Sequence, residues 1–360
     1  MNKKDYLDKL SAELKNRLRE DAAEELLADF NEHFNEALRD GKSEDEVCLM
    51  LGDPTEIAAE YCEIMASGAG ESGGTPASDD TGIYINLTQM SLLIEPGSDD
   101  RFDVELLRNN RVVQDDSLQV RQTRNALQVI QAREHDFVSQ MFRAFRFSEL
   151  VKVRIPQSFT GGMIVKMTSG SARIYGIAIS GDVNFHLTSG SIHMQNVASA
   201  GQMIIESRSG SINMENCTGE LSVGCVSGSV KVKSHNGNVL RAAAYSGSVK
   251  VEAARIDKNC IIESKSGSIN AEFGSLKADL SMSCRSGSIK FTVRELKGNI
   301  TGKTNSGNIK GKLAHDTRAV FLLQSSGAGN RFPNAVMPDG SAPVVNLTSR
   351  SGRVSVKELL

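Results

Sequence analysis

Residues 264–271 (SKSGSINA) and 284–291 (CRSGSIKF) share a Ser-Gly pair that is followed two residues later by isoleucine, twenty residues apart. The same pair recurs ten times towards the C-terminus, with steps of 20, 20, 18, 19, 20, 20, 20, 20 and 25 residues. Repetition at this period indicates stacked coils, each of which buries its apolar face only against its neighbours. We call the glycines of these pairs the marker glycines: Gly170, Gly190, Gly210, Gly228, Gly247, Gly267, Gly287, Gly307, Gly327 and Gly352.

Apolar residues keep fixed positions relative to the marker glycines. Because side chains alternate between the two faces of a strand, such columns predict a buried stack. A weaker glycine marker between the pairs, as at Gly181 and Gly201, predicts a second corner in each coil. The column two residues after the marker holds Ile192, Ile212, Val230, Val249, Ile269, Ile289 and Ile309, and the column five residues before it holds Val165, Phe185, Ile205, Val223, Ile262, Met282 and Leu322.

The marker glycine has a physical reason at a sharp corner. A tight bend often needs a positive φ, and a side chain there would strike the next coil. The neighbouring serine hydroxyls can satisfy backbone groups that the bend leaves open. The sequence therefore predicts a mainly β protein, a parallel β-solenoid (a single-stranded β-helix) with about 20 residues per coil, over residues 161–357.

The N-terminal segment 1–66 has a different pattern. Leu7, Leu10, Leu14 and Leu18 recur at helical spacing, and a second amphipathic run follows up to Gly41. Ser43 and Glu46 have the spacing of a capping box, which predicts another helix start. We expect a small all-α domain at 1–66 that self-associates or docks a partner, since so short a domain is marginally stable alone.

A Gly/Ser/Pro-rich linker is expected at 67–81, followed at 82–160 by β-structure that begins and caps the solenoid. Residues 142–147 (FRAFRF) are either an exposed aromatic and basic patch or a cap strand with buried phenylalanines; the second is the favoured interpretation. The Pro-rich residues 332–338 interrupt the period, and a final coil from Val344 to Val356 is expected to close the stack.

Composition narrows the class of protein. The net charge of −3 offers no global attraction to nucleic acid, and no stretch has the roughly 20 apolar residues of a transmembrane helix. The six cysteines form no CxxC pair and have no zinc-ligand spacing, which favours free thiols in a reducing compartment. No signal-peptide pattern follows Met1. We expect a cytoplasmic protein, with peripheral membrane association as an alternative.

Candidate catalytic groups are sparse, and no catalytic, cofactor or metal site is predicted. Glu252 and Glu272 occupy equivalent outward positions on adjacent coils, but the same column holds Lys233 and Lys312, which indicates a solvated face. The repeated serines have no fixed His/Asp partner. The run at 298–304 is one residue short of a phosphate-binding loop and no helix follows it.

One outward surface is enriched in basic residues. These residues lie three after or two before the marker glycine and could form a ladder that holds an anionic glycan or another polyanion. The alternative is a solvated face on which lysines discourage edge pairing. The ladder comprises Arg173, His193, Arg208, Lys231, Lys250, Lys265, Arg285, Lys290 and Lys310.

These repeats, preceded by LVKVRIP at 150–156, resemble the bacterial β-strand-repeat putative adhesin family, whose function is unknown. The segment 1–66, with KDYL at 4–7 and LGDP at 51–54, resembles the HAAS-type helical signalling domain. The resemblance implies a bacterial protein connected with envelope stress or signalling, and a PadR-like regulator as partner. Relatives often have transmembrane helices after the helical domain, whereas this chain has the Gly/Ser linker there.

Three functions follow as hypotheses. The first is a non-enzymatic scaffold whose helical domain binds a protein partner or a second copy. The second is a surface that binds an anionic glycan or polymer. The third, and weakest, is a β-helix enzyme that acts on polysaccharides, which would need a carboxylate cluster in a groove.

Overall fold

The computed structural model describes residues 2–18, 20–39, 41–55, 57–59, 81–114, 116–132, 149–325, 327–330 and 342–359. The chain divides into two compact units, one that contains the helices and one that contains most of the strand residues. Several predictions fall outside the described residues: almost all of the linker, Ser326, the 142–147 segment and the Pro-rich 332–338 segment.

The described part of the helical unit contains the helices α1 (Lys3–Lys15), α2 (Glu20–Arg39) and α3 (Glu44–Leu51). The capping box predicted at Ser43 and Glu46 is present at the start of α3, and Gly52 ends this helix with a φ of 83°. Helical residues resume at 54–55 and 57–59. The apolar faces share one core, formed by Tyr6, Leu10, Leu14, Ala23, Leu26, Phe30, Phe34, Val47, Cys48, Leu51, Ile57 and Ala58.

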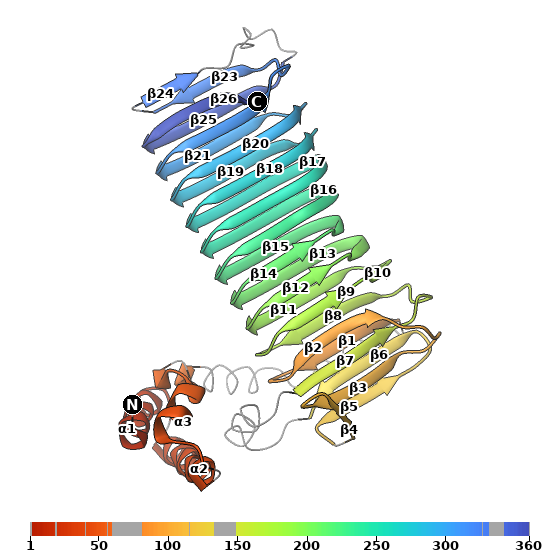
Figure 1. Cartoon of the computed structure of the whole chain (residues 1–360), viewed down its shortest axis with the longest axis vertical. Coiled ribbons are helices and arrows are strands. Elements are labelled where there is room, and N and C mark those ends of the chain that lie inside the picture. Colours follow the sequence, from red (N-terminus) through yellow and green to blue (C-terminus); the bar gives the residue numbers. More distant parts are fainter. Residues whose placement is uncertain are drawn as a thin grey trace. The chain divides into compact units, whose positions relative to one another are not determined.

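The β unit is a parallel β-solenoid, as the repeat predicted (Figure 1). Each coil contributes strand residues to two faces. The strands of the first face are β6 (Ala126–Gln131), β1 (Gly82–Leu87), β8 (Gly162–Met167), β11 (Val183–Ser189), β13 (Ala198–Ser209), β15 (Thr218–Ser227), the second halves of β16 (Val230–Ser246) and β17 (Val249–Ser266), β19 (Asp279–Ser286), β21 (Ile300–Ser306), β25 (Val344–Ser351) and β23 (Val320–Gln324).

Most strands of the second face start just after a Ser-Gly corner; β7, β2 and β24 are the exceptions among the described strands. They are β7 (Glu149–Ile155), β2 (Ser91–Pro96), β9 (Ala172–Tyr175), β12 (Ile192–Gln195), β14 (Ile212–Glu215), the first halves of β16 and β17, β18 (Ile269–Leu276), β20 (Ile289–Leu296), β22 (Ile309–Ala314), β26 (Arg353–Leu359) and β24 (Gly327–Asn330). The remaining strands are β3 (Asp103–Arg108), β4 (Arg111–Val113), β5 (Leu118–Gln122) and β10 (Ala178–Ile179).

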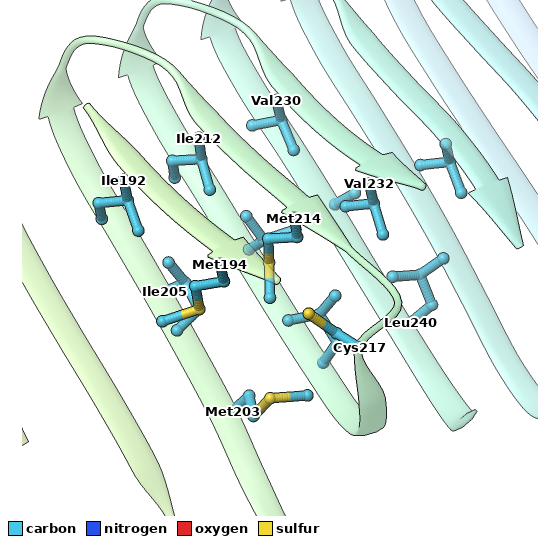
Figure 2. Close-up of a cluster of buried hydrophobic side chains, with 14 of the residues drawn as sticks. Ile192, Met194, Met203, Ile205, Ile212, Met214, Cys217, Val230, Val232 and Leu240 are labelled. Atoms are coloured by element: carbon cyan, nitrogen blue, oxygen red, sulfur yellow. The ribbon is translucent and has the colours of Figure 1, made fainter. Parts of the chain in front are cut away.

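The predicted apolar columns meet between the two faces. Ile192, Ile212 and Val230 lie side by side on the second face, opposite Met203 and Ile205 on the first (Figure 2). All five of these side chains are buried. Coiling therefore converts strand alternation into one continuous core that runs through the stack.

The coils at the N-terminal end are not stacked in sequence order. Strand β1 pairs in parallel with both β6 and β8, and β2 pairs with both β7 and β9. The chain thus builds the coil of β1 and β2, adds β6 and β7 on one side of it, and continues with β8 on the other side (Figure 1). Strand β5 extends this end by antiparallel pairing with β6.

The C-terminal end departs from sequence order too, and the expectation that the final coil closes the stack is wrong. Strand β25 pairs with both β21 and β23, and β26 pairs with both β22 and β24. The last coil in sequence is therefore an interior coil. Its apolar set is complete, because Val345, Leu347, Val354 and Val356 are all 0% exposed.

The coil of β23 and β24 lies outside it and has a shifted register. Gly327 pairs with Arg353 rather than with Gly352, so the marker glycine of this coil lies one residue beyond the corner. A shift of one residue exchanges the inward and outward faces of a strand. Leu322, which the column predicted to be buried, is accordingly 48% exposed, while Phe321 and Leu323 pack against the core instead.

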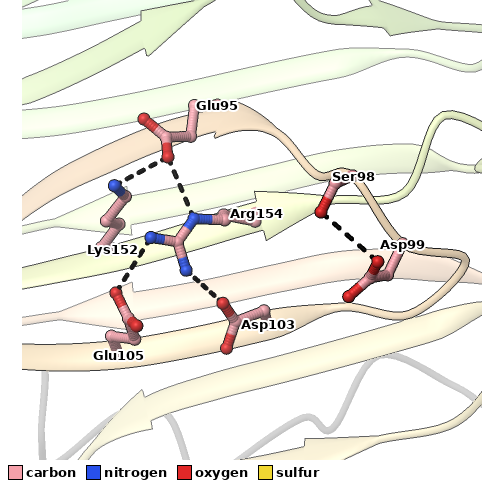
Figure 3. A network of polar contacts seen from close by, with 7 residues as sticks. All are labelled: Glu95, Ser98, Asp99, Asp103, Glu105, Lys152 and Arg154. Carbon is pink, nitrogen blue, oxygen red and sulfur yellow. Dashed lines mark hydrogen bonds and ion pairs between the residues drawn. The ribbon is translucent and has the colours of Figure 1, made fainter.

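A charged network joins three strands of the N-terminal coils (Figure 3). The guanidinium of Arg154 on β7 contacts Glu95 of β2 at 3.1 Å, Glu105 of β3 at 3.2 Å and also Asp103. Lys152 pairs with Glu95 at 2.7 Å. Burial raises the pKa of Glu95, but the hydrogen bonds from Lys152 and Arg154 outweigh this and hold it below its ordinary value.

Candidate functional site

The Ser-Gly corners form a straight column along the solenoid. Nine of the ten marker glycines have a positive φ, from 95° at Gly170 to 157° at Gly352. From Gly190 to Gly307, a β-carbon on each would overlap the carbonyl oxygen of the marker glycine one coil earlier, and one on Gly352 would overlap that of Gly307. From Gly190 to Gly307, the marker glycine also donates its N–H to a serine of the next coil, as Gly267 does to the carbonyl of Ser286 at 3.0 Å. The corner therefore requires glycine for both conformation and space.

A buried polar column supports these corners, and the sequence reasoning missed it. In five coils, the residue three before the marker glycine donates from a hydroxyl or thiol to the glycine carbonyl of the preceding coil. Ser264 reaches Gly247 at 3.0 Å, and Cys284 reaches Gly267 at 3.0 Å. Cys225, Thr304 and Ser349 make equivalent bonds. The sequence contains a pattern that could have predicted this column, because Ser, Cys and Thr recur three residues before the marker glycine in an otherwise apolar inward pattern.

The buried cysteines have environments that suit packing better than reactivity. Burial raises the pKa of the thiols of Cys217, Cys225, Cys260 and Cys284. A raised pKa leaves little thiolate, the reactive form, at neutral pH. Cys225 and Cys284 are buried in the core, and their bonds to the corner carbonyls add a second role to this packing.

The second corner lies about five residues earlier than the glycines Gly181 and Gly201 that were expected to mark it, and Gly201 falls inside β13. Residues with positive φ bend the chain there, namely Gly176, Asn196, Asn216 and Ser234, and the side chains of Asn216 and Asn196 hydrogen-bond at 3.1 Å. His235 follows in the chain and is 0% exposed, with neither ring nitrogen in full hydrogen-bond geometry with any described residue. Burial lowers the pKa of His235 to about 4, although the backbone near Cys217 and Gly219 partly opposes this. His235 is therefore an uncharged core residue at neutral pH.

The structure aligns one column of the predicted basic ladder. Arg173 pairs with His193, Lys231 with Lys250, and Lys290 with Lys310, all on the second face. Asn213 and Asn270 separate these pairs in the same column. His193 is also engaged locally, since its Nδ1 lies 3.1 Å from the Asn213 amide and its ring contacts Tyr175.

The second column of the ladder, on the first face, mixes cations with apolar groups. Lys265 Nζ lies 4.1 Å from the ring centroid of Tyr245 and donates to its hydroxyl at 2.8 Å. This hydrogen bond and the nearby charges of Lys265 and Arg285 lower the pKa of Tyr245. Val226 and Tyr245 are exposed at equivalent positions of successive repeats. Lys265 is thus committed to a partner, and Arg208 has interactions of its own.

No catalytic constellation is evident in the part of the chain that the structure describes. Glu252 and Glu272 are register partners, as their spacing predicted, but they lie on an outward face and Arg294 approaches Glu272 at 3.8 Å. Within the described ranges, no three His, Cys, Asp or Glu side chains come together as metal ligands would. The described helices likewise include none with the length and apolar character needed to cross a bilayer.

Stacked parallel coils with a glycine corner, an apolar interior and polar outer faces define a repeat protein of the β-solenoid class. Residues 81–328, more than half of the chain, match the family model described as Toastrack DUF4097, and the chain belongs to this family. Residues 5–60 match the HAAS model. Both predicted resemblances, to an adhesin-like β-repeat family and to HAAS, are confirmed.

Similarity to individual known proteins is weak. No curated protein matches the chain. A crystal structure from Clostridium sporogenes, described as a "putative cell adhesion protein", is similar with 9% sequence identity over 78% of this chain and 92% of that chain. Its TM-score is 0.17, so the similarity carries no weight for the fold or function of this chain.

Proposed function

We propose that this protein is a non-enzymatic binding scaffold whose helical region docks a protein partner or a second copy, while the solenoid serves as a rigid platform. The observation that carries the proposal is the exposure of Leu49. This residue lies on α3 and is 86% exposed, the largest exposed fraction of any large apolar side chain in the described chain. The buried core of a protein–protein interface is apolar, and Leu49 is the side chain to which we assign that place.

The surroundings of Leu49 suggest the chemistry of the partner. Helix α3 has three acidic residues in its first turn, Glu44, Asp45 and Glu46, and no basic residue in its last turn. A surface with an apolar pocket and basic groups at its rim would complement it. By family resemblance, a PadR-like regulator is the partner we favour, in a cytoplasmic pathway of envelope-stress or signalling regulation.

The test compares Leu49→Ser with Val112→Ser in the full chain. Val112 is 60% exposed on β4 and provides a matched loss of exposed apolar area outside the helices. We expect Leu49→Ser to weaken self-association in light scattering, or capture of a purified PadR-like regulator from the same host, by about tenfold. Val112→Ser should leave both unchanged. Equal behaviour of the two variants in both assays would refute the proposal.

Two further parts of the proposal have their own tests. Cell fractionation of the native host should find the protein in the cytosol; recovery in the envelope would favour the role of a surface binder. The remaining alternative, a polysaccharide-active enzyme, would require release of sugars from a polysaccharide, with loss of that activity in Glu252→Gln or Glu272→Gln.

A further inference from the structure

The three interior coils nearest the C-terminal end carry an unusual density of positive charge. They are the coils with corners at Gly287, Gly307 and Gly352, built from β19 to β22 with β25 and β26. Their outward positions near the corner column hold eight exposed basic side chains, which we call the C-terminal basic patch: Arg285, Lys290, Lys303, Lys310, Lys312, Arg350, Arg353 and Lys357.

The charge of this patch is not compensated within the described part of the chain. No described carboxylate lies within ion-pair distance of any of its eight members. The glutamates on the same coils have other partners, because Glu295 pairs with Lys297 at 2.7 Å and Glu358 pairs with His315. Equivalent positions on earlier coils are different: Lys233 pairs with Glu215 at 2.7 Å, and Lys231 also acts on Glu215.

Two pairs of lysines within the patch are direct neighbours on adjacent strands. Lys290 is the register partner of Lys310, and Lys312 is the register partner of Lys357. Adjacent strands lie about 4.8 Å apart, and like charges placed side by side on them repel. These pairs therefore oppose folding unless an anion offsets them.

Edge protection does not explain Lys290, Lys310 or Lys312. Lysine on an outermost strand prevents a second sheet from adding to its open backbone. Strand β20, however, pairs with both β18 and β22, and β22 pairs with both β20 and β26. These three lysines therefore lie on strands that are paired on both sides, and protection of an open edge is not their role.

We propose that the C-terminal basic patch binds a linear polymer of closely spaced phosphate groups. The solenoid holds the ammonium groups in rows at strand spacing, a regular array that a flexible chain of phosphates can follow. Lysine binds phosphate as a point charge, and uncharged side chains such as Thr292 and Ser355 stand beside the cations as hydrogen-bond donors. The ligand adds a binding function to the scaffold and needs no residue of the helical region.

The surface favours this ligand over two others. Single-stranded nucleic acid is usually held on exposed aromatic rings as well as cations, and the described residues of these three coils expose no phenylalanine, tyrosine or tryptophan ring. A bilayer would be aided by exposed apolar side chains, and none of the large exposed ones in the described chain lies on these coils. A base-free phosphate polymer requires only the charges and polar groups that are present.

The chain supplies a matched pair of variants in one register column. Lys290→Gln with Lys310→Gln removes a lysine pair inside the patch, and Lys231→Gln with Lys250→Gln removes an equivalent pair outside it. The full-length protein is titrated with end-labelled inorganic polyphosphate at several salt concentrations between about 50 and 200 mM. Identical thermal melting of the variants shows that both remain folded.

We expect the affinity of the wild-type protein for polyphosphate to fall steeply with salt. The double variant inside the patch, Lys290→Gln with Lys310→Gln, should bind about tenfold more weakly or worse. In this variant the slope of log affinity against log salt should also be smaller by about 1.5, since each lost phosphate contact contributes about 0.7 to 0.9. The control pair should change affinity less than about twofold. No binding by the wild type, or equal losses in the two variants, would overturn the site.

Two parallel titrations test the ligand class. Oligo-dT and vesicles containing phosphatidylserine replace polyphosphate, with the same two variants. The assignment to a base-free polymer would be overturned if oligo-dT or the vesicles bound as tightly as polyphosphate and if Lys290→Gln with Lys310→Gln reduced their affinity by the same factor. The Leu49 experiment reports on assembly alone, so failure of the scaffold proposal and failure of this site can be told apart.

Discussion

Gly267 lies directly over Gly247, so closely that a β-carbon on Gly267 would overlap the carbonyl oxygen of Gly247. The same relationship repeats between marker glycines from Gly170 to Gly307, and the inserted final coil maintains it between Gly307 and Gly352. It makes the corner column the least tolerant feature of the solenoid and leads to the first prediction.

Gly267→Ala should strongly destabilise the solenoid. The φ of Gly267 is 150°, which strains an alanine by about 1–3 kcal/mol, and the overlap with Gly247 adds to this. We expect a loss of at least about 2 kcal/mol in the free energy of unfolding, measured by chemical denaturation. Gly224→Ala is the control, because nothing lies within 4 Å of its added β-carbon; a similar loss there would contradict the argument.

Ser264→Ala tests the buried polar column. The hydroxyl of Ser264 is buried and donates to the carbonyl of Gly247, so its removal should cost about 1–3 kcal/mol of stability. Ser264→Cys should be close to wild type, since Cys225 and Cys284 make the same contact in other coils. Ser281→Ala, on the exposed face of β19, should change stability by less than about 0.5 kcal/mol.

His235 should make the stability depend on pH in a defined window. Its folded pKa is about 4 and its unfolded pKa is about 6.5, so between these values the unfolded chain binds more protons than the folded one. Stability is then fully present above about pH 6.5 and falls by about 3 kcal/mol on acidification towards pH 4. His235→Leu should remove this component from denaturation midpoints measured between pH 4 and 7. An unchanged pH profile in the variant would show that His235 does not titrate in this way.

Engineered disulfides test the order of the C-terminal coils. Lys310 and Ser355 are register partners, so Lys310→Cys with Ser355→Cys places two α-carbons about 4.8 Å apart, which suits a disulfide. Gly329 is the register partner of Ser355 on its other side. Lys310→Cys with Gly329→Cys would bridge only if the coils followed sequence order. Peptide mapping by mass spectrometry after mild oxidation should find the first bridge and not the second.

Much of the fold could be predicted because residues close together in each repeat determine the shape of its coil. A Ser-Gly pair in each repeat and apolar residues at fixed offsets specify a coil and its interior, and Ile192, Ile212 and Val230 lie where their columns placed them. The family resemblances followed from the same residues and from the helical pattern at the N-terminus.

The order of the coils could not be predicted from this pattern, because every coil presents nearly the same hydrogen-bonding edge. The step from Gly307 to Gly327 has the usual length of the repeat, yet Gly327 is one residue out of register and Leu322 faces outwards. Two coils could pair with β21 and β22, and the one that fills the core better is expected to be the more stable neighbour. The 344–356 coil fully buries four apolar side chains, whereas Leu322 of the other coil faces outwards. The lack of carboxylate partners for the C-terminal basic patch could not be predicted either, because it depends on which residues are neighbours across strands.

The position of the 344–359 coil has a consequence for how the protein is made. On a ribosome, residues 320–330 emerge before residues 344–359, but in the finished molecule they lie outside them. The earlier segment cannot reach its native neighbours until residues 344–359 have been synthesised and have settled against β21 and β22. This end of the stack therefore does not form in the order of synthesis, and a nascent chain stalled before residue 344 carries an unfinished stack.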